Sequence, residues 1–379
     1  MIKPGQVLSV DIIDLASDGQ GVAKHADGLV IFVPGVWPGE RVKIRFEKLQ
    51  GRVGRATLLE IESASTARRD APCEYHGVHS GQCGGCPWMF ADYAAQLAEK
   101  RRRVERDVSR IDPRITINRV ISAENQLAYR NRCQLKSDGR QLGYLSAGSN
   151  TLVDVEQCSV LETNLQDNLK YLRQQLPNPI WRPNKKHKWV TLDLDSHMQP
   201  GEVSVNQRRA FQQANSQQNT QMREWLAQTL AKKNRSAKVL ELFAGSGNLT
   251  DIILQAGFRE SVAVECVPEA VTRLEALQAS LKVELVDLFN EDAFSSLVQR
   301  HKDADILVLD PPRDGLKIKN NLFKRLKSLH SVIYVSCDLA TFCRDLRDFT
   351  KNGFCVTDLC LLDMFPQTPH LEILCSLSR

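Results

Sequence analysis

The sequence contains no long apolar segment. Its longest apolar runs, such as Leu29–Val33, fall far short of the roughly 20 residues that a membrane-spanning helix requires. The residues Met1–Gly5 lack the apolar core of a secretory signal peptide, and no long repeat or low-complexity tract is present. We therefore expect a cytoplasmic protein without a membrane partner, and a monomer by default.

A strong excess of one charge is also missing. The 379 residues include 50 basic and 45 acidic side chains, which leaves a net charge of +5. This mild excess permits a nucleic-acid partner without demonstrating one. With 42% hydrophobic and 25% charged residues, the chain has the composition of a folded protein, and its length suggests two or three domains.

Cysteine is abundant by contrast. The chain has 11 cysteines, an odd number that excludes a complete set of disulfides. In a reducing compartment, closely spaced cysteines more often bind metal or do chemistry. Cys73, Cys83 and Cys86 lie close together in the sequence, and Cys158 is a distant candidate for a fourth ligand. Four thiolates suit an iron–sulfur cluster or tetrahedral zinc, and their spacing does not choose between the two.

The chain divides into three regions of different pattern. Short strand-like segments separated by glycine and proline turns predict a small β-barrel over residues 1–62. Residues 63–205 mix strand and loop signals and form a central domain with the four candidate ligands. From residue 206 to residue 379, apolar runs alternate with helical stretches, which is typical of a doubly wound α/β domain with a parallel sheet. The expected strands are Val239–Phe243, Val262–Glu265, Val283–Asp287, Ile306–Asp310 and Val332–Ser336, and the expected helices include Pro268–Leu281 and Asn320–Leu329.

Two segments are distinctly basic. Arg41, Lys43 and Arg45 alternate along an expected strand and would share one of its faces. Lys100–Arg103 lies in an expected helix. Each segment either contacts RNA or forms an ordinary solvated surface, and charge alone does not decide between these interpretations.

Unusual residues follow the expected strands at their carboxyl ends, where open α/β sheets bind ligands. Gly245 and Gly247 follow the first strand and let the backbone approach a ligand closely. The third glycine of a dinucleotide-binding loop is absent, because Thr250 takes its place. Glu265, 20 residues after Gly245, suits ribose hydroxyls, and Asp287 ends the third strand. This pattern favours S-adenosylmethionine over a dinucleotide.

The fourth expected strand runs into Asp310–Arg313, which reads Asp-Pro-Pro-Arg. Asp-Pro-Pro is similar to the motif with which amino-directed nucleic-acid methyltransferases hold an exocyclic nitrogen. Those enzymes usually place an aromatic residue next, so Arg313 argues against that chemistry. A rigid structural turn is the other interpretation of this segment.

Two residues are candidates for covalent chemistry. Cys337 follows the fifth strand as a candidate nucleophile, although a free cysteine is often just a small buried side chain. Glu372 opens the last apolar run and is either a general base or a structural acid. A thiolate, a methyl donor and a base fit methylation of carbon 5 of uracil. Thiolate addition to carbon 6 makes carbon 5 nucleophilic, and removal of the carbon 5 proton then expels the thiolate.

These motifs together resemble those of bacterial RNA (uracil-5-)-methyltransferases with a TRAM domain and an iron–sulfur cluster, especially those that modify 23S ribosomal RNA. Asp18–Ala23 and Phe32–Gly35 are similar to TRAM domains, which are small RNA-binding barrels of the oligonucleotide-binding type. Phe211–Asn215, Ser336–Thr341 and Leu362–Glu372 resemble the family's cofactor, nucleophile and base motifs. The resemblance covers nearly the whole chain.

The resemblance implies a Rossmann-like S-adenosylmethionine-dependent domain and a four-iron four-sulfur cluster. It makes Cys337 the nucleophile and Glu372 the base. It assigns contacts with S-adenosylmethionine to Gln213, Phe243, Asn248, Glu265, Asp287 and Asp310. It assigns the cluster to Cys73, Cys83, Cys86 and Cys158.

Three features depart from the family's pattern. Nine residues separate Cys73 from Cys83, more than is usual, which makes Cys73 the least certain ligand. Asp338 and Leu339 stand where the family has Asn-Pro. The stretch after Cys158 is short for the family, which puts family-level RNA contacts there in doubt.

The expected activity is methylation of one uridine to 5-methyluridine in structured RNA, with 23S ribosomal RNA as the first candidate. The target base is expected to be flipped out of a loop, because a stacked base is out of reach. Transfer RNA as the substrate, an amino-directed methyltransferase that uses Asp310, and a non-catalytic RNA-binding or assembly factor remain as alternatives. A zinc site in place of the cluster also stays open.

Overall fold

The computed structural model describes residues 2–207, 211–316 and 325–379. The chain forms two compact units. The first holds residues 1–98, 124–209 and 365–369, and the second holds residues 99–123, 210–364 and 370–379. Among the helices of the described residues, none has the length and apolar character needed to cross a membrane.

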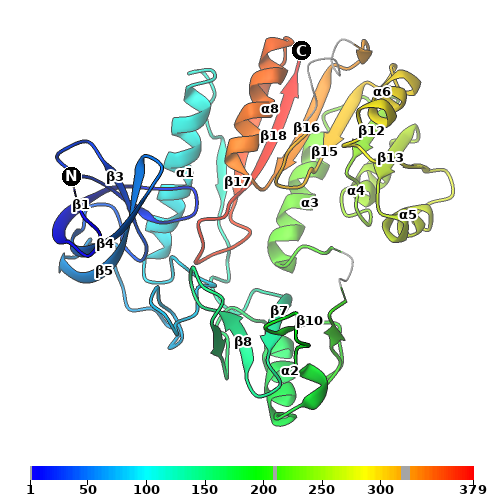
Figure 1. Ribbon diagram of the computed structural model, residues 1–379. Helices are drawn as coiled ribbons and strands as arrows, with labels where there is room; N and C mark the ends of the chain where they lie inside the picture. Colours follow the sequence, from blue (N-terminus) through cyan, green and yellow to red (C-terminus); the bar gives the residue numbers. More distant parts are fainter. Residues whose placement is uncertain (1, 208–210, 317–324) are drawn as a thin grey trace. The chain divides into compact units, whose positions relative to one another are not determined.

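The first unit begins with a closed barrel, drawn in blue in Figure 1. Alternate residues of its fourth strand point inward, so that Val42, Ile44 and Phe46 are buried. Parallel pairing between the third and fifth strands completes the barrel, which confirms the predicted fold of this region. The strands are β1 (Val7–Leu15), β2 (Gly21–Lys24), β3 (Val30–Val33), β4 (Arg41–Gln50) and β5 (Val53–Ser63).

The first unit also contains a five-stranded antiparallel sheet, in the order β11-β10-β7-β8-β9. Its strands are β7 (Arg132–Ser137), β8 (Leu142–Leu145), β9 (Leu152–Asp154), β10 (Val190–Asp195) and β11 (Ser204–Val205). Helix α2 (Thr163–Gln174) packs Leu165, Leu169 and Leu172 into the core of this sheet. A short 3-10 helix, η1 (Pro179–Trp181), adds the buried Trp181.

The second unit is built on an eight-stranded sheet in the order β14-β13-β12-β15-β16-β18-β17-β6. The strands from β14 to β16 are parallel, and β18 runs antiparallel to both of its neighbours. This arrangement confirms the expected Rossmann-like α/β fold. The strands are β6 (Arg119–Ile121), β12 (Val239–Leu242), β13 (Ser261–Glu265), β14 (Lys282–Leu285), β15 (Ile306–Leu309), β16 (Ser331–Ser336), β17 (Cys355–Leu362) and β18 (Glu372–Ser378).

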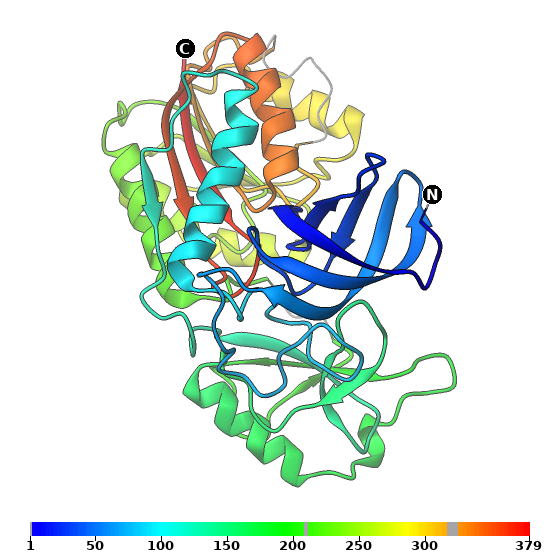
Figure 2. The ribbon, with the colours of Figure 1, turned by 90° about the vertical axis from the view of Figure 1, so that its left-hand side faces the viewer.

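Helices pack against this sheet and bury its apolar strands. Figure 2 shows α1 and α8 side by side on one face, where Val104 and Val108 of α1 join Phe342 and Leu346 of α8 in one core. The helices are α1 (Tyr93–Ser109), α3 (Ser216–Leu230), α4 (Thr250–Gln255), α5 (Pro268–Glu275), α6 (Glu291–Arg300) and α8 (Leu339–Lys351). Helix α5 is shorter than expected, and the expected helix Asn320–Leu329 lies in part outside the described residues.

The basic segments are largely paired with acids. In the barrel, Arg41 pairs with Asp11 and Lys43 pairs with Glu60 across the strands. The helical segment Lys100–Arg103 also forms ion pairs. In the most buried of these, Lys100 Nζ lies 2.6 Å from Asp363 Oδ1, and both side chains are nearly inaccessible to solvent. Much of the positive charge in these segments is therefore neutralised within the protein.

Candidate active site

The expected cofactor loop lies at the carboxyl end of β12, in a conformation that few side chains tolerate. Gly245 and Gly247 adopt φ angles of 57° and 93°. A Cβ on Gly247 would also lie 2.5 Å from a methyl carbon of Leu277, so the exposed Leu277 side chain would have to move. Phe243 has a φ of 61° although it is not glycine, which stores backbone strain of about 1–3 kcal/mol.

Glu265 ties this loop to the neighbouring strand β13. Its Oε2 accepts a hydrogen bond from the Gly245 N–H at 2.9 Å, and its Oε1 accepts from the Cys266 and Val267 N–H groups. The side chain is buried. The carboxylate therefore fixes the loop in addition to any contact with a ribose hydroxyl.

The other expected cofactor contacts surround the same loop. Asn248 exchanges two side-chain hydrogen bonds with Asn219 of α3. Asp287 lies two residues beyond the end of β14, exposed, and caps the turn to Phe289, whose ring lies 5.7 Å from that of Phe243. The two aromatic rings are tilted by 45° to each other.

Gln213 lies in the segment that leads into α3. It is half-buried and lies two residues before Asn215, which caps α3 by accepting a hydrogen bond from the Gln218 N–H. The Asn215 amide also donates to the Met364 carbonyl. Asn215, the last residue of the segment Phe211–Asn215, thus has a structural role, which the sequence interpretation missed.

Strand pairing brings the two candidates for covalent chemistry together. Ser336 pairs with Ile373 across β16 and β18, so Cys337 and Glu372, the next residues in the two directions, fall opposite each other. Cys337 is half-buried, whereas only 4% of Glu372 is exposed. A thiol and an acid that lie 35 residues apart in the sequence are therefore neighbours at the carboxyl edge of the parallel strands.

Burial in this site disfavours the charged forms of its thiol and its carboxyl groups. Burial, with the nearby charges of Glu372 and Asp310, raises the pKa of the Cys337 thiol to about 12. Burial and the charge of Asp310 also raise the pKa of Glu372 well above its usual range, and burial raises the pKa of Asp310 to about 7. Arg313 is the positive group that opposes the shifts of Cys337 and Glu372.

Asp338 explains how the chain replaces the family's Asn-Pro. Its side chain caps α8 by accepting hydrogen bonds from the Thr341 N–H at 2.9 Å and from the Thr341 hydroxyl at 3.1 Å. Asp and Asn are both good caps. Leu339 takes the first helical position, where proline is common but not required. The turn after Cys337 therefore keeps its helix cap.

Glu241 is a further buried acid that the sequence interpretation missed. It lies inside β12, is 3% exposed and accepts a hydrogen bond from the Thr250 hydroxyl. Burial, with the charges of Asp310 and Glu265, raises its pKa to about 8. An acid in the middle of an apolar strand was the signal in the sequence.

The four candidate cluster ligands gather in the first unit as free thiols. Cys73, Cys86 and Cys158 contact one apolar cluster around Met89. Burial raises the pKa of Cys83 to about 11, and the charges of Cys158 and Cys73 add to this. Charge interactions of this kind link Cys83 to two of the other three thiols.

The backbone of the cysteine loop is closely packed. The backbone of Cys83 forms isolated β-bridges with that of His76 and with that of Ser146. Gly84 leaves no room for a side chain, because its Cβ would lie 2.7 Å from the Ala147 Cα. Within the described part of the chain, however, no three His, Cys, Asp or Glu side chains are grouped as they would be around a metal ion.

Comparison with known proteins gives a consistent result. The sequence model of the tRNA (Uracil-5-)-methyltransferase family matches residues 115–379, and that of the TRAM domain matches residues 3–59. An uncharacterized RNA methyltransferase of Nitrosomonas europaea is 38% identical over 96% of this chain and 94% of its own. The 23S rRNA (uracil(1939)-C(5))-methyltransferase of Pseudomonas fluorescens is 28% identical over 98% of this chain and 92% of its own.

A solved structure shares the fold. The tRNA (uracil-54, C5)-methyltransferase of Pyrococcus abyssi, determined with S-adenosyl-L-homocysteine, has a TM-score of 0.73 and 19% identity, and the match covers 98% of this chain and 100% of that one. The family match extends over most of the chain, including all of the candidate active site described above. The chain therefore belongs to the tRNA (Uracil-5-)-methyltransferase family and carries a TRAM domain at its N-terminal end.

Proposed function

We propose that the protein methylates carbon 5 of one uridine in 23S ribosomal RNA through a covalent adduct between Cys337 and carbon 6. The register between β16 and β18 carries this proposal, because it sets the thiol beside Glu372 at the edge where the cofactor loop lies. The match to a 23S ribosomal RNA methyltransferase along nearly the whole chain supports the choice of RNA.

The residues act in the following order. The thiolate of Cys337 adds to carbon 6 of the flipped uracil, and the electron pair makes carbon 5 nucleophilic. S-adenosylmethionine, when bound, supplies the methyl group as an electrophilic sulfonium. Glu372, as a carboxylate, then takes the carbon 5 proton, and the carbon 6–sulfur bond breaks to restore the double bond and the thiolate.

The raised pKa values define what substrate binding must change. With a pKa of about 12, Cys337 is a neutral thiol near pH 7, and the raised pKa of Glu372 favours its protonated form. The thiol must lose a proton before it attacks, and Glu372 must be ionised before it accepts one. Arg313 lowers both pKa values, which suits it to stabilise these charged forms.

The cofactor is proposed to lie on the glycine loop of β12. Phe243 and Asp287 surround the position of the adenine, Glu265 receives the ribose hydroxyls, and Asp310 lies beside Cys337 where the methyl group is transferred. Gln213 and Asn248 complete the set. Membership of the family supports S-adenosylmethionine as this cofactor.

We propose three functional regions in the chain. Residues 1–62 form the TRAM barrel, residues 63–205 the central region with the cluster, and residues 206–379 the methyltransferase domain. The barrel is proposed to contribute to RNA binding, and the enzyme is proposed to act as a monomer.

Cys73, Cys83, Cys86 and Cys158 are proposed to hold a four-iron four-sulfur cluster. Methyl transfer moves no net electrons, so the cluster would support structure and RNA docking. Protein purified without oxygen should show broad visible absorption that Cys86→Ser removes. A colourless sample with one zinc per chain would instead assign the thiols to zinc.

Labelled methyl transfer tests the activity. The wild-type protein is incubated with S-adenosylmethionine that carries a labelled methyl group and with either unmodified 23S ribosomal RNA or unmodified transfer RNA. Labelled 5-methyluridine should form in the ribosomal RNA. Cys337→Ala should lose activity and the covalent adduct, while Cys355→Ala, at an exposed cysteine outside the site, should keep both. Full activity of Cys337→Ala would favour the amino-directed alternative, and no transfer by the wild type to any RNA would favour a binding factor.

A further inference from the structure

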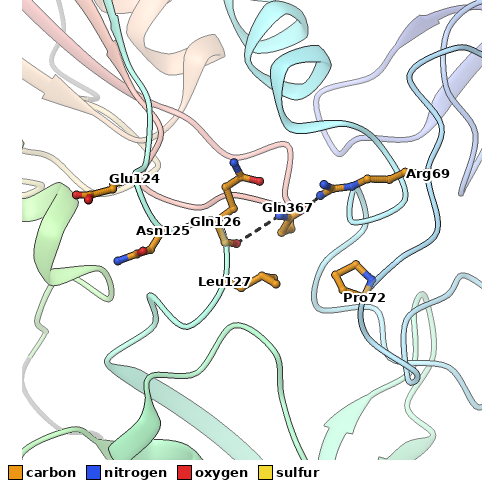
Figure 3. Close-up of a pocket in the computed structure, with 7 residues that line it drawn as sticks. All are labelled: Arg69, Pro72, Glu124, Asn125, Gln126, Leu127 and Gln367. Carbon is orange, nitrogen blue, oxygen red and sulfur yellow. Dashed lines mark hydrogen bonds between the residues drawn. The ribbon is translucent and has the colours of Figure 1, made fainter.

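The first unit contains a pocket of about 300 Å³, at the lower end of the range for ligand sites. Figure 3 shows the residues that line it, which are Arg69, Pro72, Glu124, Asn125, Gln126, Leu127 and Gln367. Its lining comes from three segments distant in the sequence, and none of the residues proposed for methyl transfer belongs to it. The pocket therefore shares no residue with that chemistry.

Gln367 forms a rigid wall of the pocket. It is fully buried, with a φ of 68°, a strained conformation for a residue other than glycine. Gln96 holds it from both sides: the Gln96 amide donates to Gln367 Oε1, and the Gln367 N–H donates to Gln96 Oε1, each at 2.9 Å. The Gln367 amide also donates to the Gln126 carbonyl. Its polar groups are thus used within the protein.

Arg69 keeps hydrogen-bonding capacity for a ligand. Its neighbour Arg68 is fully engaged, with two hydrogen bonds to Glu40 and one to the Gly35 carbonyl. Within the described residues, by contrast, the Arg69 side chain donates only to Gln367 Oε1, and its buried Nε has no partner. Among the described residues no carboxylate pairs with it. The Nε atom is covered by the protein, so a ligand in the pocket would bind the remaining N–H groups of this half-buried guanidinium.

The remaining lining offers an apolar wall and a second polar group. Figure 3 shows Pro72 and Leu127 on one side of the pocket and Gln126 beside Gln367. The Gln126 side chain is half-buried and makes no hydrogen bond with the rest of the described chain. Apolar contacts for a flat face, an amide with donor and acceptor atoms, and a guanidinium form the usual set for an unstacked nucleobase.

We propose that this pocket receives an unpaired nucleotide of the RNA other than the target uridine. Its base lies against Pro72 and Leu127, and its acceptor atoms meet Arg69 and Gln126. This inference rests on the proposed function, because it requires an RNA substrate. It adds a contact that recognises the RNA away from the reacting base.

The pocket also gives the cysteine loop a role in binding. Pro72 immediately precedes Cys73, and Leu127 packs in the same apolar cluster as Cys73, Cys86 and Cys158. Order in the cysteine loop therefore fixes one wall of the pocket. Loss of that order is expected to raise the KM for RNA before it changes the chemical step.

Kinetics with a short RNA stem–loop that carries the mapped target uridine tests the proposal. Arg69→Ala should raise the KM for this RNA by about 5- to 150-fold, the range for loss of one specific base contact, with little change in kcat. Gln126→Ala, which removes no internal hydrogen bond, should act in the same direction. Arg259→Ala removes an exposed arginine of the second unit and serves as the matched control. Thermal unfolding should show that all three variants fold.

Abasic substitutions in the same RNA identify the nucleotide. Omission of one particular base should weaken binding to the wild type and have no further effect on Arg69→Ala. An equal loss for every RNA, with a smaller salt dependence, would show that Arg69 only neutralises phosphates and would overturn the proposal. Wild-type KM in both pocket variants would overturn it as well. If the wild type methylates no RNA at all, the proposed function fails first, and the two failures are thus distinguishable.

Discussion

At the residue scale, Glu372 separates two steps of the proposed mechanism. Glu372→Gln removes the base but leaves Cys337 in place, so methylation of the adduct proceeds and its breakdown does not. We expect kcat to fall by at least about 100-fold, since general base catalysis contributes roughly 10²–10⁴-fold. A protein–RNA species that persists on a denaturing gel measures the trapped adduct.

The control for this substitution is Glu275→Gln, at an exposed acid near the end of α5. It removes the same charge and should leave the rate unchanged. Rapid turnover by Glu372→Gln, with no trapped species, would assign the proton transfer to another group.

The thiol gives a second prediction at this scale. Because burial and neighbouring acids raise the pKa of Cys337 to about 12, the thiolate fraction in the free protein is small near pH 7 and grows with rising pH. Alkylation of Cys337 by iodoacetamide should therefore be slow at pH 7 and accelerate up to pH 10, as followed by mass spectrometry of its peptide. A rate that levels off below pH 8 would contradict the raised pKa.

At the scale of single elements, the cap of α8 fixes the turn that carries Cys337. Asp338→Ala removes the hydrogen bonds to Thr341 and should lower the free energy of unfolding by about 1 kcal/mol. Asp338→Asn, which restores the family's residue, should keep most of this stability. Denaturant unfolding of the three proteins measures the difference, and equal midpoints would show that the cap contributes nothing.

Several elements of the catalytic sheet could be predicted because their sequences carry the pattern locally. β15 is four consecutive buried aliphatic residues, and Glu372 begins β18 as the apolar run indicated. Asp287, in contrast, lies beyond β14, which ends at Leu285, because the strand stops where its pairing with β13 stops. Local composition does not reveal where a partner strand ends.

Long-range pairing is the part that the sequence did not reveal. β6 is only three residues long, yet it pairs with β17, more than 200 residues later, at Ile121 and Leu362. Nothing in so short a segment indicates its partner. The position of Lys100 also depends on a residue distant in the sequence. It lies in a basic segment that could form a surface, but it is buried in an ion pair with Asp363. The candidate catalytic pair was predicted from motifs, whereas its cause, the register of β16 and β18, required the structure.

At the scale of the whole molecule, buried acids link stability to pH. The pKa values of Glu241 and Asp310 are raised to about 8 and about 7, so the folded protein binds protons that the unfolded chain has released. Stability is then fully present below the unfolded pKa values, near 4, and falls as the pH rises toward 8. Each such group contributes a slope of at most about 1.4 kcal/mol per pH unit.

Glu241→Gln tests this link away from the reacting groups. The amide keeps a partner for Thr250 but does not titrate, so the loss of stability between pH 5 and pH 8 should become shallower than in the wild type. Thermal unfolding across this pH range measures the slope. Identical slopes in both proteins would place the titration elsewhere.

The order in which segments of the chain contribute to the two units determines which fragments of the protein can fold. The chain passes from one unit to the other five times, and the second unit needs residues 99–123 as well as those after 210. A fragment that begins at residue 206 would lack β6, leaving the edge of β17 unpaired, and would lack Val104 and Val108 from the core. Exposed strand edges and apolar surface promote aggregation. The catalytic half is thus a domain in space but not a separable segment of sequence.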